Sequence, residues 1–96
     1  MALEDIKKIL KELLPGLREK YHVSELGIFG SYATGEQKEG SDVDVLVEFR
    51  EPISLFKYVE LKLFLEEKLK MEVDLVQKSG LKRLIKDDIL KETLYI

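Results

Sequence analysis

The chain has 96 residues, enough for one small hydrophobic core, so we expect a single domain spanning residues 1–96. Hydrophobic residues make up 45% of the sequence and charged residues 36%, a balance typical of a compact soluble domain and not of a disordered tail. Sixteen Lys and Arg residues against nineteen Asp and Glu residues give a net charge of −3, which disfavours sequence-independent binding to nucleic acid. We therefore expect no direct contact with nucleic acid.

Two absences narrow down the compartment and the chemistry. No apolar run approaches the roughly 20 residues that cross a bilayer, and residues 1–8 lack a signal-like core. We therefore expect a cytoplasmic protein with no membrane partner. The sequence has no Cys and a single His, His22, which excludes thiol nucleophiles, thiolate-bound metals and His-based metal clusters. Any metal site must use oxygen ligands.

The first half of the chain predicts a helix, a strand and a short helical turn. Apolar residues at helical spacing predict an amphipathic helix over the first twenty residues, interrupted or kinked near Pro15-Gly16. A short apolar run from Leu26 that closes at Gly30 predicts a buried strand. Residues 32–41 are rich in Gly and polar side chains, which favours one helical turn followed by a loop.

The second half predicts two further strands and two helices. Residues 43–49 alternate Val with other residues, as a strand does, and Pro52 stops that strand. Ser54 is a plausible N-cap for a helix through Leu69. A strand over residues 72–77 and a final helix over residues 81–94 complete a mixed α/β (α+β) fold, a small mixed β-sheet covered by helices.

Three aspartates stand where a strand does not favour them. Asp42 and Asp44 are two residues apart and project from the same face near the start of the second strand, while Asp74 lies between two apolar residues of the third. A buried carboxylate without a partner costs more than a small domain can absorb, and no Lys or Arg falls within these strands. Such oxygen ligands suit Mg²⁺, and two such ions can clamp a phosphoryl or nucleotidyl transfer. Asp74 can share these ions if its strand neighbours the second strand.

Each aspartate also has a plainer interpretation. Asp42 follows Gly40-Ser41, where Asp is common as a turn residue, so for Asp42 alone the odds are about even. Asp74 also fits an exposed edge strand, whereas Asp44 is the hardest to explain without a ligand, because Asp is disfavoured inside a strand. Taken together, the three residues favour a site.

Gly30-Ser31 joins the first strand to the helical turn, where free backbone N–H groups attract phosphate and Gly permits a close approach. Alone, the dipeptide is equally typical of a strand end followed by a helix cap. However, ten residues separate it from Asp42-Val43-Asp44. Roughly one chain per thousand of this length would carry these four fixed positions by chance.

This spacing resembles the signature of the nucleotidyltransferase superfamily that includes DNA polymerase beta. The resemblance is closest to the minimal nucleotidyltransferases, the MntA-like antitoxins paired with HEPN-domain toxins, and it covers nearly the whole chain. It is carried by Phe29–Ala33 with Gly35-Glu36, by Ser41–Phe49, and by the tail Ile85–Tyr95. It implies a polymerase beta palm-like fold and an enzyme that uses ATP and Mg²⁺ to attach AMP to a tyrosine of the HEPN toxin, silencing that toxin within a hetero-oligomer.

By position, the resemblance implies that Asp42 and Asp44 hold two metal ions. It further implies that Asp74 holds one of these ions and helps to activate the attacking hydroxyl, and that Gly30 and Ser31 cradle the ATP phosphates. All five residues are present.

One position departs from the family pattern. Where many relatives have an Arg after Ala33, this chain has Thr34, so a phosphate contact is missing or replaced. Lys38, Lys82 or Arg83 could replace it, although such charges more often belong to a solvated face.

Three hypotheses follow. The first is the adenylyltransferase, and the second is a weakly active or inactive module of the same fold that neutralises its partner by binding it. The third is a small α/β protein whose acidic residues bind no metal. The helix over residues 55–69 is apolar well beyond one stripe, which indicates either a surface for another protein or a helix mostly buried within a small domain.

Overall fold

The computed structural model describes residues 1–96 as four strands, four α-helices and one short 3-10 turn. In chain order these are α1 (Leu3–Tyr21), β1 (Val23–Phe29), α2 (Ser31–Thr34), β2 (Val43–Phe49), α3 (Leu55–Leu69), β3 (Val73–Gln77), η1 (Lys78–Gly80), α4 (Arg83–Glu92) and β4 (Leu94–Tyr95).

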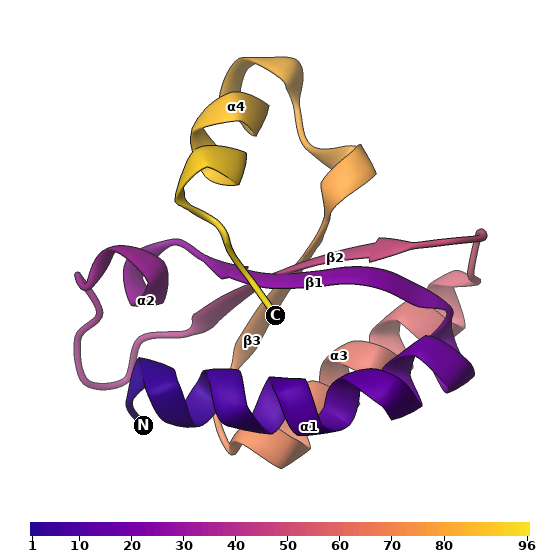
Figure 1. Cartoon of the computed structure of the whole chain (residues 1–96), viewed down its shortest axis with the longest axis horizontal. Helices are drawn as coiled ribbons and strands as arrows, with labels where there is room; N and C mark the ends of the chain where they lie inside the picture. The colour runs from indigo at the N-terminus through magenta and orange to yellow at the C-terminus, as the bar shows by residue number, and fades with distance from the viewer.

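The strands form one mixed sheet in the order β3-β2-β1-β4. β1 is antiparallel to both β2 and β4, whereas β2 and β3 are parallel, joined by the crossover helix α3. Helices α1 and α3 lie on one side of the sheet, and α4 stands on the other side (Figure 1). The expected small mixed sheet covered by helices is therefore confirmed.

The hydrophobic core lies between the sheet and the pair α1 and α3. Val43, Val45 and Val47 of β2 are fully buried in it. Because side chains alternate along a strand, the residues between these valines face away from the helices, toward α4. The helices contribute aliphatic residues at helical spacing to this core, namely Ile6, Leu10 and Leu17 from α1 and Leu61, Leu65 and Leu69 from α3.

Helix α1 was expected to be interrupted or kinked near Pro15-Gly16, and the interruption is wrong, because the helix runs without a break through Pro15. Proline removes one backbone hydrogen bond, to the carbonyl of Lys11. Both Pro15 and Lys11 are exposed, so water can satisfy the freed carbonyl, and this explains why the helix tolerates the proline.

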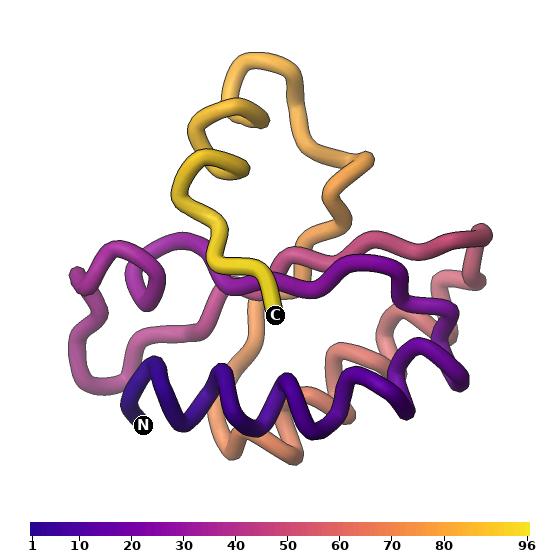
Figure 2. Tube along the Cα trace, viewed as in Figure 1, coloured from indigo at the N-terminus to yellow at the C-terminus, as the bar shows by residue number.

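The end of the chain also differs from expectation. The final helix stops at Glu92, and Leu94–Tyr95 form β4 on the free edge of β1. The Thr93 hydroxyl donates a hydrogen bond to the Ile89 carbonyl (2.6 Å), and the Ile96 N–H donates to the Leu26 carbonyl (2.8 Å). The trace shows this last segment crossing the sheet at β1 (Figure 2).

The middle elements follow the sequence more closely. β2 and α3 have the predicted bounds, and the Ser54 hydroxyl caps α3 by accepting a hydrogen bond from the Lys57 N–H (3.1 Å). β1 begins at Val23, three residues earlier than the apolar run indicates. No helix in the chain is both long enough and apolar enough to span a membrane.

Candidate active site

The parallel pairing of β2 and β3 brings two of the three predicted acidic residues together. Asp44 and Asp74 are direct partners in the register, and both lie on the sheet face opposite the core. The adjacency of the two strands, on which the sequence argument depended, is thus confirmed. Asp74 lies on β3, an edge strand, and is exposed, whereas Asp44 is half-buried.

Because Asp44 is half-buried, its pKa is shifted further from the ordinary value than that of any other carboxyl group of the chain. Burial is the largest cause, followed by the charge and hydrogen bond of Asp74 and then by the charges of Asp42 and Glu92. Together they raise the pKa of Asp44 from 3.8 to about 6. Like charges around a partly desolvated carboxylate disfavour ionisation, so this corner of the sheet favours a bound cation.

No cation of the protein itself fills that place. The four ion pairs of the structure join Lys7 to Glu4, His22 to Glu51, Lys57 to Glu60 and Lys78 to Glu25, and none of them includes Asp42, Asp44 or Asp74. The donor chemistry at Asp44 and Asp74 therefore fits a hard divalent cation such as Mg²⁺.

The three aspartates nevertheless do not form a ready three-ligand set, since no group of three His, Cys, Asp or Glu side chains has metal-site geometry. Asp42 lies just before β2 and is exposed. Asp42 and Asp74 are reached by water, so the predicted burial of a carboxylate is wrong for both, and Asp44 is buried only in part. Asp42 and Asp74 stand at a turn and on an edge strand, positions where an unpaired Asp is tolerated.

The backbone conformation at position 30 and the neighbouring Asp44 side chain together restrict this position to Gly. Its φ of +69° and ψ of −149° are accessible to Gly and strained for other residues. A Cβ built on Gly30 would collide with the carboxylate of Asp44. The Gly30 backbone therefore approaches the acidic pair more closely than any other residue type permits.

Thr34 closes the short helix that follows Gly30. Its hydroxyl bonds the Glu36 carboxylate (2.8 Å) and lies within hydrogen-bonding distance of the Gly30 and Ser31 carbonyls. Thr34 thus supplies no positive charge. The cations considered as replacements, Lys38, Lys82 and Arg83, are all exposed and belong to no ion pair, as expected of a solvated face.

Glu92 is a neighbour of this site that the sequence alone does not indicate. Its carboxylate accepts a hydrogen bond from the Gly30 N–H (3.1 Å), 62 positions away in the sequence. It also lies near enough to raise the pKa of Asp44. No local pattern could have revealed this contact, because it depends on β4 pairing with β1.

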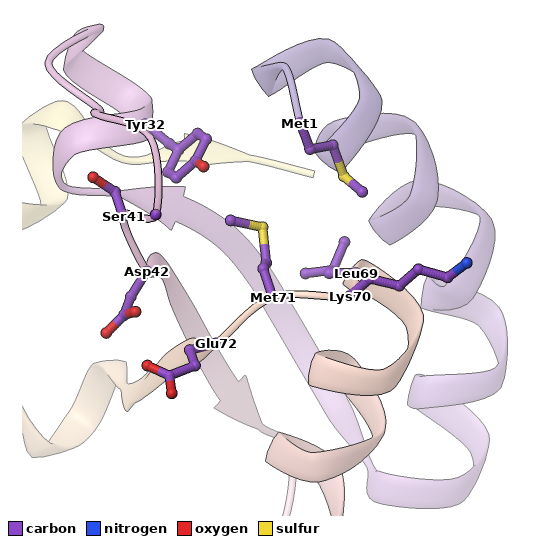
Figure 3. A pocket seen from close by; sticks show the side chains of 9 residues that line it. Met1, Tyr32, Ser41, Asp42, Leu69, Lys70, Met71 and Glu72 are labelled. Atoms are coloured by element: carbon purple, nitrogen blue, oxygen red, sulfur yellow. The ribbon is translucent and has the colours of Figure 1, made fainter.

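A cavity of about 490 Å³ opens beside the start of β2. It lies between the beginning of α1, the loop before β2 and the turn from α3 to β3, and it includes Asp42. In Figure 3 the apolar side chains of Met1, Leu69 and Met71 gather around the hollow, whereas the Asp42 carboxylate points away from it. The cavity therefore adjoins the acidic residues and does not contain the pair formed by Asp44 and Asp74.

Comparisons of the sequence and of the structure with known proteins all find nucleotidyltransferases. The model of the nucleotidyltransferase domain family matches residues 3–96. The protein adenylyltransferase MntA of Thermococcus cleftensis is 49% identical over 100% of this chain and 97% of its own length. A solved structure described as a minimal nucleotidyltransferase is 35% identical, with a TM-score of 0.84 over 98% of this chain and 95% of the other.

A more distant structure shares the fold. It is the tri-AMPylated HEPN toxin of Shewanella oneidensis in complex with an MNT antitoxin, and the match has a TM-score of 0.68 at 19% identity. It covers 94% of this chain and 70% of the matched chain.

The fold and the family match define an enzyme of the nucleotidyltransferase class. The chain belongs to the nucleotidyltransferase domain family. Within that family it is similar to the minimal, MntA-like nucleotidyltransferases.

Proposed function

We propose that this protein is a Mg²⁺-dependent protein adenylyltransferase that transfers AMP from ATP to a tyrosine of a HEPN-type toxin and thereby acts as its antitoxin. The observation that carries this proposal is the pairing of Asp44 with Asp74, beside the Gly30 backbone and without a cation of the protein. The relative from Thermococcus cleftensis is a protein adenylyltransferase, and a structure of the same fold contains an AMPylated HEPN toxin.

In this proposal Asp42, Asp44 and Asp74 hold the metal ions, with Asp42 turning its exposed side chain toward the other two. When bound, Mg²⁺ offsets the negative charge of the phosphates and of the acidic residues. Gly30 and Ser31 bind phosphate oxygens, and the absence of a Cβ at Gly30 lets them approach the acidic pair.

Asp74 accepts the proton of the attacking tyrosine hydroxyl. The phenolic oxygen then bonds to the α-phosphorus of ATP, the bond from that phosphorus to the bridging oxygen breaks, and pyrophosphate leaves. Asp74 suits this role because it is exposed on an edge strand, where the partner's side chain can reach it.

The partner surface is proposed to include α3. This helix buries Leu61, Leu65 and Leu69 but leaves a second apolar stripe in water. Of the two alternatives for this helix, the one in which a small domain buries most of it is therefore wrong. Leu55 and Phe56 are 78% and 76% exposed, and Val59 and Leu63 continue the stripe along the helix. An uncovered stripe of this kind is typical of a surface that meets another protein.

Transfer of label from α-phosphate-labelled ATP to a purified HEPN-domain partner tests the proposal. We expect label on the partner with Mg²⁺ and wild-type protein, and a loss of at least about 100-fold with Asp44→Asn or Asp74→Asn. Asp88→Asn, an exposed acidic residue on α4, is the matched control and should label as wild type does. Undiminished transfer by Asp44→Asn would contradict the proposal.

A second candidate function is neutralisation by binding alone. It is favoured by Thr34, which supplies no cation, and by the absence of a ready three-carboxylate set. Its signature would be a stable complex that silences the partner equally well with wild-type protein and with Asp44→Asn, without label on the partner.

A further inference from the structure

The hydrogen bond between Glu92 and Gly30 places an anion of the protein on the amide group proposed to bind a phosphate. The Glu92 carboxylate oxygen lies 3.1 Å from the Gly30 nitrogen in a partly buried contact. A carboxylate and a phosphate make the same demand on a backbone N–H, and one N–H can serve only one of them well. We propose that Glu92 occupies the place of a nucleotide phosphate and competes with the nucleotide for the Gly30 amide.

The backbone that follows Glu92 fixes this placement. Leu94 and Tyr95 pair with Ile28 and Gly27 of β1, two and three residues before Gly30. A Cβ on Gly27 would lie 2.7 Å from the Thr93 side chain, so Gly27 allows the chain to cross β1 closely at this point. The end of α4 is therefore held against the sheet with Glu92 beside Gly30, and rotation of the Glu92 side chain is enough to free the amide.

The charges around Glu92 indicate a weak attachment. Asp44, itself near Asp74, is an acidic neighbour that repels Glu92. None of the four ion pairs of the structure includes Glu92. The Gly30 amide is the attraction that holds Glu92 at the site, and a more highly charged phosphate bound with its metal can displace it.

It follows that Glu92 sets the affinity for the nucleotide. Glu92 is an affinity-determining residue and takes no part in bond making, and this role rests on the proposed function because it requires the phosphate to contact Gly30. Removing the competing contact should strengthen binding of phosphate-bearing ligands, whereas a purely structural anchor would change stability and leave their affinity unchanged.

Calorimetric titration of the full chain with the ATP analogue AMP-PNP and Mg²⁺ tests this inference. Glu92→Asp keeps the charge but shortens the side chain by one methylene, so that its carboxylate no longer reaches the amide. Glu92→Gln keeps the length but removes the charge. We expect both variants to bind AMP-PNP roughly three- to tenfold more tightly than wild type, the range that one ordinary net hydrogen bond corresponds to. Adenosine, which has no phosphate, should bind all forms equally.

The controls separate the possible failures. Asp87→Asn removes an exposed charge from a different face of the same helix and should bind AMP-PNP as wild type does. The role of Glu92 would be overturned if Glu92→Asp bound AMP-PNP with wild-type affinity. It would also be overturned if either variant bound AMP-PNP more weakly with an unchanged melting temperature. Either result would leave the proposed function intact. If neither wild type nor the variants bind AMP-PNP with Mg²⁺, the proposed function fails and the role of Glu92 fails with it.

Discussion

At the scale of single residues, Asp44 carries the clearest physical signature of function. Its carboxyl is partly desolvated and has acidic neighbours and no cation, and its pKa is raised from 3.8 to about 6. A carboxyl group whose pKa is higher in the folded state than in the unfolded state stabilises the protein fully at a pH below the unfolded pKa. This stabilisation is lost as the pH rises through the folded pKa. The contribution of Asp44 to the stability of the metal-free protein should therefore be lost between about pH 4 and pH 6.

We predict that Asp44→Asn removes this loss and stabilises the metal-free protein near neutral pH. The gain should be about 1 kcal/mol once solvent screening of a half-exposed group is allowed for. In a domain of this size that is a rise of about 4–8 °C in melting temperature. Thermal melts across pH without divalent cations would measure it, and Mg²⁺ should raise the melting temperature of wild type but not of the variant. An Asp44→Asn variant that melts lower than wild type without metal would contradict this account.

Gly30 offers a second prediction at this scale. Gly30→Ala would combine a backbone conformation that alanine rarely adopts with a collision against the Asp44 carboxylate, so it should cost about 2–4 kcal/mol of unfolding free energy. Gly35→Ala is the matched control, because Gly35 also has a positive φ but no heavy atom lies near its Cβ position. The control should cost about 1 kcal/mol. Equal losses for the two variants in denaturant titrations would show that the close approach to Asp44 has no consequence.

At the scale of elements, the edge strand β3 depends on its anchor to α3. The Tyr58 hydroxyl donates a hydrogen bond to the Leu75 carbonyl (2.7 Å), next to Asp74 in the strand. We predict that Tyr58→Phe lowers the unfolding free energy by about 1 kcal/mol, because it removes one hydrogen bond and leaves the carbonyl unpaired. Tyr95→Phe, the same change at an exposed position, should cost less. Urea titrations of the two variants give the comparison, and identical midpoints would contradict it.

Some of these elements could be predicted from the sequence and others could not. The Val alternation of β2 and the N-cap at Ser54 are local signals, so the bounds of β2 and α3 follow from the sequence. β4 has only two residues and exists because β1 offers an unpaired edge, which no local pattern records. Asp74 was expected near Asp44 only if their strands are neighbours, which the parallel pairing of β2 and β3 supplies. The contact from Glu92 depends on β4 and could not be foreseen.

At the scale of the whole molecule, the two faces of the sheet differ in what they carry. The side that carries α1 and α3 holds the core, and the side facing α4 leaves the acidic residues accessible. A chain this small has little surface to bind an acceptor protein beyond its covering helices. The exposed stripe of α3 and the open face of the sheet are therefore proposed to meet the partner together.

This division predicts how surface substitutions behave. Leu55→Ser with Phe56→Ser should leave the melting temperature within about 2 °C, because both side chains are already in water. It should weaken the complex with the HEPN-type partner by about tenfold or more, as expected when central apolar contacts are lost. Leu84→Ser, at a position 93% exposed on α4, makes the same kind of change away from α3 and serves as the comparison for the α3 stripe alone. Equal affinity of all forms in a binding titration would remove α3 from the interface.

The central claim is that the acidic pair and the Gly30–Ser31 backbone together bind a metal nucleotide. A crystal structure of the protein with AMP-PNP and Mn²⁺ in place of Mg²⁺ tests it most directly, because anomalous scattering locates the metal. We predict manganese bound by Asp44 and Asp74, with Asp42 turned toward it, and phosphate oxygens on the amides of Gly30 and Ser31. Nucleotide bound elsewhere, or manganese absent from this pair at saturating concentration, would contradict the claim.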